Sequence, residues 1–398
     1  MKERAPLVCV LVDAFRHDYL DDERTPFLAR VAASGRAAPL PTILGYSDAV
    51  RATIFTGSYP DEHGYWMEYR FSDAGSDPFG PFSSMGVLDA LPGDFAGRGI
   101  KFALSATVMP TLARRRGYPS LSLRNIPFGA LRHFDYTLKV PMTFPHALSV
   151  PTVFDRLTDA GVGWEYLSTP ELSDVSLLKQ VGGLPLETAV VFVYLHHLDM
   201  VSHLHGIGGE RFQRVLLQTD RRVEAIAAAI EERLGCPELL VFSDHGMSEP
   251  QTYVSLPRLR RHPSFGTGFW FALDATTVRL RYLDADSALV EELHRYVEER
   301  MPGRWLSEED RRAYRLPLDM QPWGDDVFLT DPGVVIFPNF HSYVRPKAMH
   351  AYDPADQDQD GIVVATSGVS LPDAPRLVDL AGAIERAAML ADHTAEPA

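Results

Sequence analysis

Short apolar runs, rich in β-branched residues, recur along the chain and predict buried strands. Residues 7–12 read LVCVLV, which is too short for a helix and is apolar at every position. Such a run is typical of a strand covered on both faces, as in a parallel sheet. The same pattern recurs at residues 162–167, 189–195, 239–242, 334–337 and 361–365.

Helical patterns lie between these strands. Thr25-Pro26 places a capping residue before a proline at the first helical position, so a helix is predicted from there to about Gly35. Further helices are predicted at residues 48–55, 151–160, 210–233 and 377–391. Alternating strands and helices indicate an α/β fold with an open, mostly parallel sheet flanked by helices.

Two stretches interrupt this alternation. Residues 65–145 are rich in Gly, Pro and aromatic residues and have weak periodicity, which predicts an irregular cap insertion. Residues 257–331 contain strand candidates at 268–273 and 277–282 and a helix at 288–299, which predicts a small α+β insertion. The predicted catalytic core is therefore made of residues 1–64, 146–256 and 332–398.

Composition and charge narrow the choice of partner. The chain has 398 residues, 45% of them hydrophobic, so it can bury a large core. A formal net charge of −15 argues against binding to a nucleic-acid duplex. It does not argue against a small phosphorylated substrate, because bound metal ions can reverse the sign of charge within a site.

We expect a cytoplasmic protein. Only two cysteines occur, Cys9 in an apolar run and Cys236, so a disulfide framework is not expected. The charged residues 1–6 are not followed by the apolar region of a signal peptide, and no stretch is long enough to span a membrane. The oligomeric state is left open.

Metal-binding residue types follow three of the predicted strands. Asp13 follows the first strand, Asp199 and His203 follow the strand at 189–195, and Asp244-His245 follow the strand at 239–242. Ligands of open α/β sheets bind beyond the carboxyl ends of the strands. A spacing of four places Asp199 and His203 on one face of a helical turn. Mixed Asp and His ligands suit zinc, or manganese, better than calcium or magnesium.

Ser47 stands where a helical pattern begins. The backbone N–H groups at a helix N-terminus favour an incoming phosphate, and a metal ion lowers the pKa of a bound hydroxyl. Ser47 is therefore either a nucleophile or a helix cap, which is the commoner use of Ser at this position.

Together these motifs resemble the alkaline phosphatase superfamily, and most closely its nucleotide pyrophosphatase/phosphodiesterase branch. The matching stretches, in the order of the family, are VDAFR at 12–16, Ser47, TGSYPDEHG at 56–64, Leu198-Asp199 with His203, FSDHGM at 242–247 and MHAYD at 349–353.

The resemblance implies two divalent ions per chain, with zinc first and manganese second. One would be held by Asp199, His203 and His350, and the other by Asp13, Asp244, His245 and the oxygen of Ser47. His350 enters through the resemblance alone. The implied activity is hydrolysis of phosphate esters through a phosphoserine on Ser47, with phosphodiester or pyrophosphate bonds favoured.

The chain departs from this branch at two positions. The branch carries Thr where this chain has Ser47, and Asn where it has Glu68. The Asn contacts a non-bridging phosphate oxygen, and a carboxylate there would repel phosphate unless it is protonated or metal-bound. Arg51 could also contact the phosphate, or it could pair with Asp48.

Other activities stay open. Residues 47–51 (SDAVR), followed by Thr56-Gly57, also fit the sulfatase signature, in which a Ser is oxidised to formylglycine and one calcium is bound. The same site would also permit a phosphomonoesterase or a phosphotransferase. A non-catalytic binding protein is disfavoured because the set of metal-ligand residues is complete.

Overall fold

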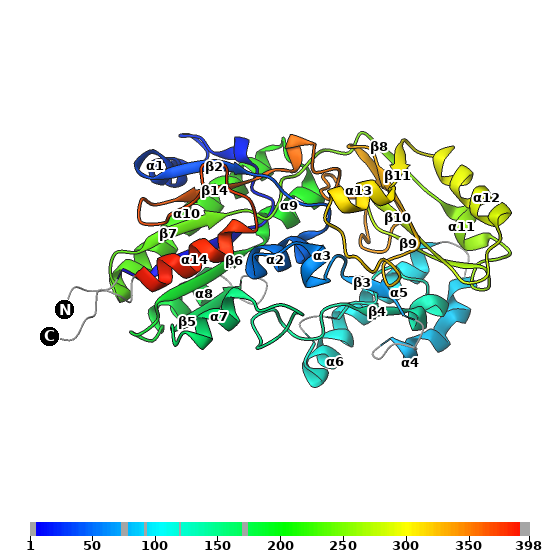
Figure 1. The fold of residues 1–398 in the computed structure, drawn as a ribbon, viewed down its shortest axis with the longest axis horizontal. Helices are drawn as coiled ribbons and strands as arrows, with labels where there is room; N and C mark the ends of the chain where they lie inside the picture. The colour runs from blue at the N-terminus through cyan, green and yellow to red at the C-terminus, as the bar shows by residue number, and fades with distance from the viewer. Residues whose placement is uncertain (1–4, 73–78, 91–93, 119–120, 169–173, 391–398) are drawn as a thin grey trace.

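The computed structural model describes residues 5–72, 79–90, 94–118, 121–168 and 174–390. Residues 1–4 at the charged N-terminus, and residue 391 at the end of the predicted helix 377–391, lie outside the described residues. Two lobes lie side by side along the long axis of the molecule (Figure 1). One lobe carries both termini, and the other is made of the two insertions.

A mixed, mostly parallel sheet forms the first lobe. Its strand order is β2-β14-β7-β1-β6-β5. Strand β1 pairs in parallel with both β6 and β7, and β5 pairs in parallel with β6. Strand β14 is antiparallel to both of its neighbours. The strands are β1 (Leu7–Val12), β2 (Arg36–Leu40), β5 (Trp164–Ser168), β6 (Val190–Leu195), β7 (Glu238–Phe242) and β14 (Gly361–Ala365). The predicted α/β fold is confirmed.

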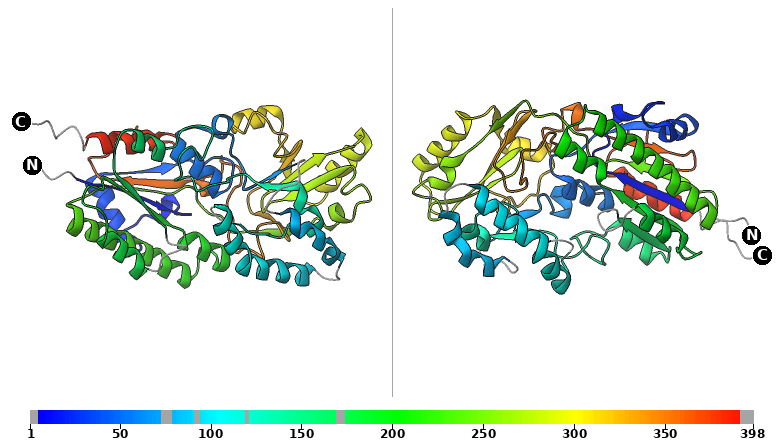
Figure 2. Two further views of the ribbon diagram at one scale, coloured as in Figure 1. Left: turned by 90° about the horizontal axis from the view of Figure 1, so that it is seen from below. Right: turned by 180° about the vertical axis from the view of Figure 1, so that it is seen from behind.

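Helices cover both faces of this sheet (Figure 2). This lobe contains the helices α1 (Pro26–Ser34), α2 (Ser47–Thr56), α3 (Pro60–His63), α7 (Val153–Asp159), α8 (Asp174–Gly182), α9 (His197–His205), α10 (Glu210–Leu234) and α14 (Asp379–Leu390). Short 3₁₀ segments are η1 (His17–Tyr19) and η4 (Gln357–Gln359).

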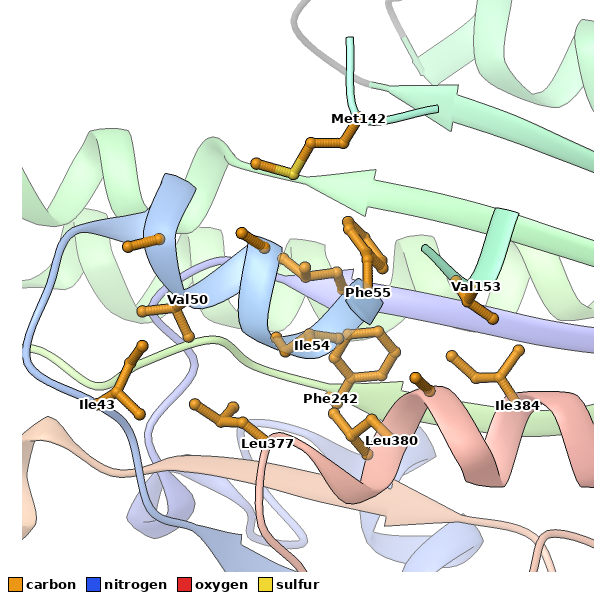
Figure 3. Packing of buried hydrophobic residues seen from close by; sticks show 14 of the residues in the cluster. Ile43, Val50, Ile54, Phe55, Met142, Val153, Phe242, Leu377, Leu380 and Ile384 are labelled. Carbon is orange, nitrogen blue, oxygen red and sulfur yellow. The ribbon is translucent and has the colours of Figure 1, made fainter. Parts of the chain in front are cut away.

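The alternating side chains of β1 enter two different cores. Leu7, Cys9 and Leu11 pack in the cluster that contains α2, α7 and α14. The intervening valines of β1 pack in a second cluster, with α1 and α10. Figure 3 shows Ile54 and Phe55 of α2 beside Phe242 of β7 and helix α14. This double burial explains why β1 is apolar at every position.

The second lobe is built from both insertions around one shared hydrophobic cluster. The cap contributes β3 (Tyr69–Phe71), α4 (Gly80–Ser83), η2 (Ser84–Ala90), α5 (Asp94–Thr107), α6 (Met109–Arg116), η3 (Phe128–His133) and β4 (Phe134–Tyr136). The other insertion contributes α11 (Pro257–Arg261), β9 (Phe269–Leu273), β10 (Thr277–Tyr282), α12 (Ser287–Glu298), β11 (Gly303–Trp305), α13 (Glu308–Ala313) and β12 (Asp326–Thr330). The cap is thus more regular than its sequence pattern indicates. The boundaries of the predicted domains stay a prediction.

One predicted strand lies outside the main sheet. The predicted strand at 334–337 is β13 (Val334–Ile336), which pairs with β8 (Thr252–Val254) in a separate two-stranded sheet. No helix among the described residues has the length and apolarity needed to cross a bilayer.

Candidate active site

The strand order explains why distant residues meet. Strand β1 lies between β6 and β7, so the carboxyl ends of these three parallel strands are neighbours. Asp13 follows β1, helix α9 with Asp199 and His203 follows β6, and Asp244-His245 follow β7. The predicted convergence of these residues at one edge of the sheet is confirmed.

Asp13, Asp244 and His245 form one buried group whose possible ligand atoms all lie within 4.8 Å of one another. Nε2 of His245 lies 3.2 Å from Oδ1 of Asp13 and 3.6 Å from Oδ2 of Asp244. Nδ1 of His245 donates to the carbonyl oxygen of Gly246 at 2.8 Å. This bond fixes the ring and leaves Nε2 available as a ligand.

Asp199, His203 and His350 form the second group. Nε2 of His203 lies 3.2 Å from Oδ1 of Asp199, four residues earlier on α9, as the spacing predicts. Nδ1 of His203 donates to the carbonyl oxygen of Ala348 at 2.8 Å, which again leaves Nε2 free for a metal.

His350 reaches the site through a local backbone bridge. Met349 and Ser248 exchange two backbone hydrogen bonds, of 2.8 and 2.9 Å, so the 349–350 segment is tied beside the residues that follow β7. The ring of His350 stacks on that of His245, with centroids 3.7 Å apart and an interplanar angle of 8°. The two groups therefore adjoin.

The hydroxyl of Ser47 does not cap helix α2. Ser47 is the first helical residue, the N-cap residue is Tyr46, and no side chain caps this end of the helix. Oγ of Ser47 instead lies 2.9 Å from Nε2 of His245. The interpretation of Ser47 as a helix cap is therefore wrong, because its oxygen is directed at the first group.

Backbone geometry at the site is tightly constrained. Ala14 and Ala351, each directly after a candidate metal-ligand residue, have φ angles of 61° and 67°. Non-glycine residues seldom adopt this left-handed conformation, and it is concentrated at functional sites. Gly246 is needed for another reason: a Cβ there would lie 2.2 Å from the carbonyl oxygen of Asp358.

Clustered charges shift the pKa values of the site. Burial and the neighbouring Asp13 raise the pKa of Asp244 to about 7. Burial lowers the pKa of His245, but Asp244 and Asp13 outweigh this effect and raise it to about 10. Burial, together with His245 and His203, holds the pKa of His350 well below its usual range. His350 is therefore a neutral imidazole, the form that binds metals.

Four buried atoms at the site make no well-formed hydrogen bond. Two of them, Oδ2 of Asp244 and Nδ1 of His350, have no such partner at all. The other two, Oδ1 of Asp13 and Oδ1 of Asp199, each face an imidazole Nε2 3.2 Å away. Leaving a buried polar atom unpaired costs free energy, and charged groups cost most. The residues present thus fit divalent ions, which would satisfy several of these atoms at once.

The side chain of Arg51 contacts two neighbouring side chains. It forms an ion pair with Asp48 on the same helix, and its guanidinium lies 4.7 Å from the ring centroid of Tyr194. Tyr194 in turn donates a hydrogen bond to Asp13. Pairing with Asp48, one of the two expected arrangements, is thus present, and contact with phosphate stays a prediction.

Glu68 is an ionised carboxylate that faces two cationic side chains. Nη2 of Arg124 lies 3.1 and 2.9 Å from its two carboxylate oxygens, and Nδ1 of His341 lies 3.6 Å from Oε2. Burial alone would raise the pKa of Glu68, but Arg124 and His341 lower it to about 2. An ion-paired carboxylate is a third possibility beside the two expected from the sequence.

Sequence patterns did not point to Arg124 and His341. His341 donates to Asp274 at 2.9 Å and stacks on Tyr46, the residue before Ser47, with centroids 5.2 Å apart. Arg124 lies in the cap and His341 in the segment after β13, so no local spacing relates them to Glu68.

Fold and site together define a member of the alkaline phosphatase superfamily. The family model for Type I phosphodiesterase / nucleotide pyrophosphatase matches residues 7–353. The chain therefore belongs to the Type I phosphodiesterase / nucleotide pyrophosphatase family, a family of hydrolases. No curated protein gives a significant match to the sequence.

Solved structures of ectonucleotide pyrophosphatase / phosphodiesterase 5 share the fold. The inactive murine protein in complex with AMP has a TM-score of 0.66 at 15% identity, covering 97% of this chain and 95% of that one. The human protein has a TM-score of 0.66 at 14% identity, covering 98% and 96%. A further murine structure has a TM-score of 0.65 at 16% identity, with the same coverage as the human protein.

Proposed function

We propose that the protein hydrolyses phosphodiester or pyrophosphate bonds through a phosphoserine on Ser47, with two divalent ions bound beside it. The observation that carries this proposal is the position of the Ser47 oxygen, 2.9 Å from Nε2 of His245. That nitrogen belongs to one metal-ligand group, and the ring of His245 stacks on His350 of the other. A hydroxyl and a pair of metal-ligand groups thus share one small space.

Each group would hold one ion. Asp199, His203 and His350 would bind one of the two ions. Asp13, Asp244 and His245 would bind the other ion together with the Ser47 oxygen. That oxygen is as close to Nε2 of His245 as two ligands of one ion are to each other. Mixed nitrogen and oxygen donors favour zinc, or manganese in its place. When bound, such ions supply positive charge for the phosphate oxygens and lower the pKa of the serine hydroxyl.

Ser47 and its helix carry the chemistry that belongs to the chain itself. The Ser47 hydroxyl gives up its proton and its oxygen forms a bond to phosphorus. The bond from phosphorus to the leaving oxygen breaks, and the leaving group departs with that electron pair and takes up a proton from solvent. Water then cleaves the phosphoserine and regenerates the hydroxyl. The N-terminus of α2, at which Ser47 stands, would add stabilisation to the negative charge of the phosphate oxygens.

A nucleotide is the proposed substrate. The family assignment supports it, and so does the murine structural neighbour that is in complex with AMP. A small phosphorylated molecule also fits the net charge of −15 better than a nucleic-acid duplex does. We place the reaction in the cytoplasm and assign no membrane partner, as expected from the sequence.

The charge of Glu68 predicts a preference for diesters over monoesters. A phosphodiester carries one negative charge and a monoester nearly two at neutral pH. A carboxylate at position 68, where the resemblance implies contact with a non-bridging phosphate oxygen, would therefore penalise the monoester more. We expect bis(p-nitrophenyl) phosphate to be hydrolysed faster than p-nitrophenyl phosphate, with a ratio of kcat/KM values of roughly tenfold or more.

The matched variant Glu68→Gln keeps the size of the side chain and removes its charge. We expect it to raise the monoesterase activity relative to the diesterase activity. A monoester preference in the native chain would move the enzyme to the phosphomonoesterase side.

Metal content separates this proposal from the sulfatase alternative. We expect two zinc or manganese ions per chain by inductively coupled plasma mass spectrometry, and loss of activity on chelation that the same metal restores. A single calcium with activity on p-nitrophenyl sulfate would support a sulfatase instead, in which Asp199, His203 and His350 would have no role.

A further inference from the structure

A cavity lies between the cap and the α+β insertion. Its volume is about 630 Å³, and its lining comes from η2, α5, α11, β9 and the segment around Asn339. None of the seven side chains of the candidate active site lines it. Small-molecule sites commonly measure roughly 300–1,000 Å³, so this cavity has the size of a binding site.

Positive charge dominates the cavity. Arg98, Lys101, Arg260 and Arg261 line it, and Asp89 is the one carboxylate among the described lining residues. Among the lining residues whose side chains the structure describes, four cations stand beside one carboxylate, in a chain whose formal net charge is −15. Such a local reversal of sign concentrates anions.

Two of these cations are held in place by Asp89. Nζ of Lys101 lies 3.7 Å from Oδ1 of Asp89 and 4.6 Å from the ring centroid of Phe128, and Lys101 is buried. Nη2 of Arg260 lies 3.3 Å from the same carboxylate oxygen and donates to the Asp89 carbonyl at 2.8 Å. Asp89 therefore contacts two of the four cations.

The other two cations have no such partner. Neither Arg98 nor Arg261 forms an ion pair with a carboxylate within the described part of the chain. Nε and Nη1 of Arg98 are buried and have no hydrogen-bond partner there. Buried guanidinium donors without an acceptor cost free energy, which an anionic ligand nearby would offset.

The remaining walls are apolar, which defines the rest of the ligand. Leu256, Phe271, Leu273 and Phe340 line the cavity together with the cations. We propose that this cavity binds a small organic phosphate with an apolar or aromatic body, at a site separate from Ser47. This inference does not rest on the proposed function of the Ser47 site.

Isothermal titration calorimetry with AMP tests the proposal on the full chain with its metals bound. The double variant Arg98→Gln/Arg261→Gln should lose one AMP site per chain, or bind there roughly ten- to a hundredfold more weakly, because two charged donors are removed. The control Arg114→Gln/Arg115→Gln changes two exposed arginines of α6 by the same charge and should bind as the native chain does.

The readout is the difference of one site between native chain and variant, whether or not the Ser47 site also binds AMP. Unfolding temperature and esterase activity show that the double variant is folded. Equal AMP stoichiometry and affinity in native chain and double variant would overturn the proposal. Adenosine, which lacks the phosphate, should not bind in the cavity. If adenosine bound there as tightly as AMP, the proposed requirement for an anion would be wrong.

Discussion

Replacing Ser47 with alanine is expected to lower kcat for bis(p-nitrophenyl) phosphate by roughly a thousandfold or more. The variant has no oxygen to attack phosphorus, and no other hydroxyl is positioned to replace it among the described residues of the two metal-ligand groups. Bound metal should stay near two ions per chain, because Asp13, Asp244 and His245 remain as ligands. Turnover and metal content are measured on the same sample.

Ser47→Thr is the informative companion, because threonine keeps a hydroxyl and stands at this position in the family branch that the chain resembles. We expect it to retain substantial activity. Ser34→Ala, which removes an exposed hydroxyl bonded to the Arg30 carbonyl on α1, should leave turnover unchanged. Activity retained by Ser47→Ala would remove Ser47 as the nucleophile, and a parallel loss of metal would make it chiefly a ligand.

The central strands could be predicted because burial on both faces gives a continuous run of apolar residues in the sequence. Strand β1 is covered on both faces, so each of its positions is apolar. Strand β2 is a two-residue alternation at the edge of the sheet, contains Pro39, and is half exposed. Its sequence, RAAPL, also lacks the β-branched residues that mark the central strands, and the sequence pattern missed it.

Some residues of the candidate site could likewise be predicted from the sequence pattern, and one could not. Asp13, Asp199 and Asp244 were found because each follows a recognisable strand, and parallel strands bring their ends together. His350 depends on the backbone bridge between Met349 and Ser248, a long-range pairing without a local signal. Only the family resemblance suggested it.

Glu68 marks the limit of reading charge from sequence. Its carboxylate was expected to need a proton or a metal, because the local sequence does not indicate which cation would face it. Arg124, 56 positions away, supplies that charge only after the cap folds. The hydrophobic cluster shared by the two insertions could not be predicted for the same reason, because an apolar residue in the sequence does not indicate which distant residues it will contact.

Replacing His350 with alanine is expected to remove one of the two metal ions and to lower activity by more than about a hundredfold. Loss of a residue that only orients a ligand commonly costs roughly ten- to a hundredfold, so loss of a direct ligand should cost more. Asp199→Ala should behave in the same way, because both residues belong to the same group. Metal per chain and kcat/KM are measured together.

The control is His205→Ala, an exposed histidine on the same helix as His203, which should change neither quantity. The ion held by Asp13, Asp244 and His245 should persist in His350→Ala, since those residues keep their own contacts. One remaining ion per chain therefore supports two separate groups, whereas loss of both ions would mean that the stacked rings of His245 and His350 act as one unit. Unchanged metal content would count against His350 as a ligand, and would leave its buried, unpartnered Nδ1 to be explained by another contact.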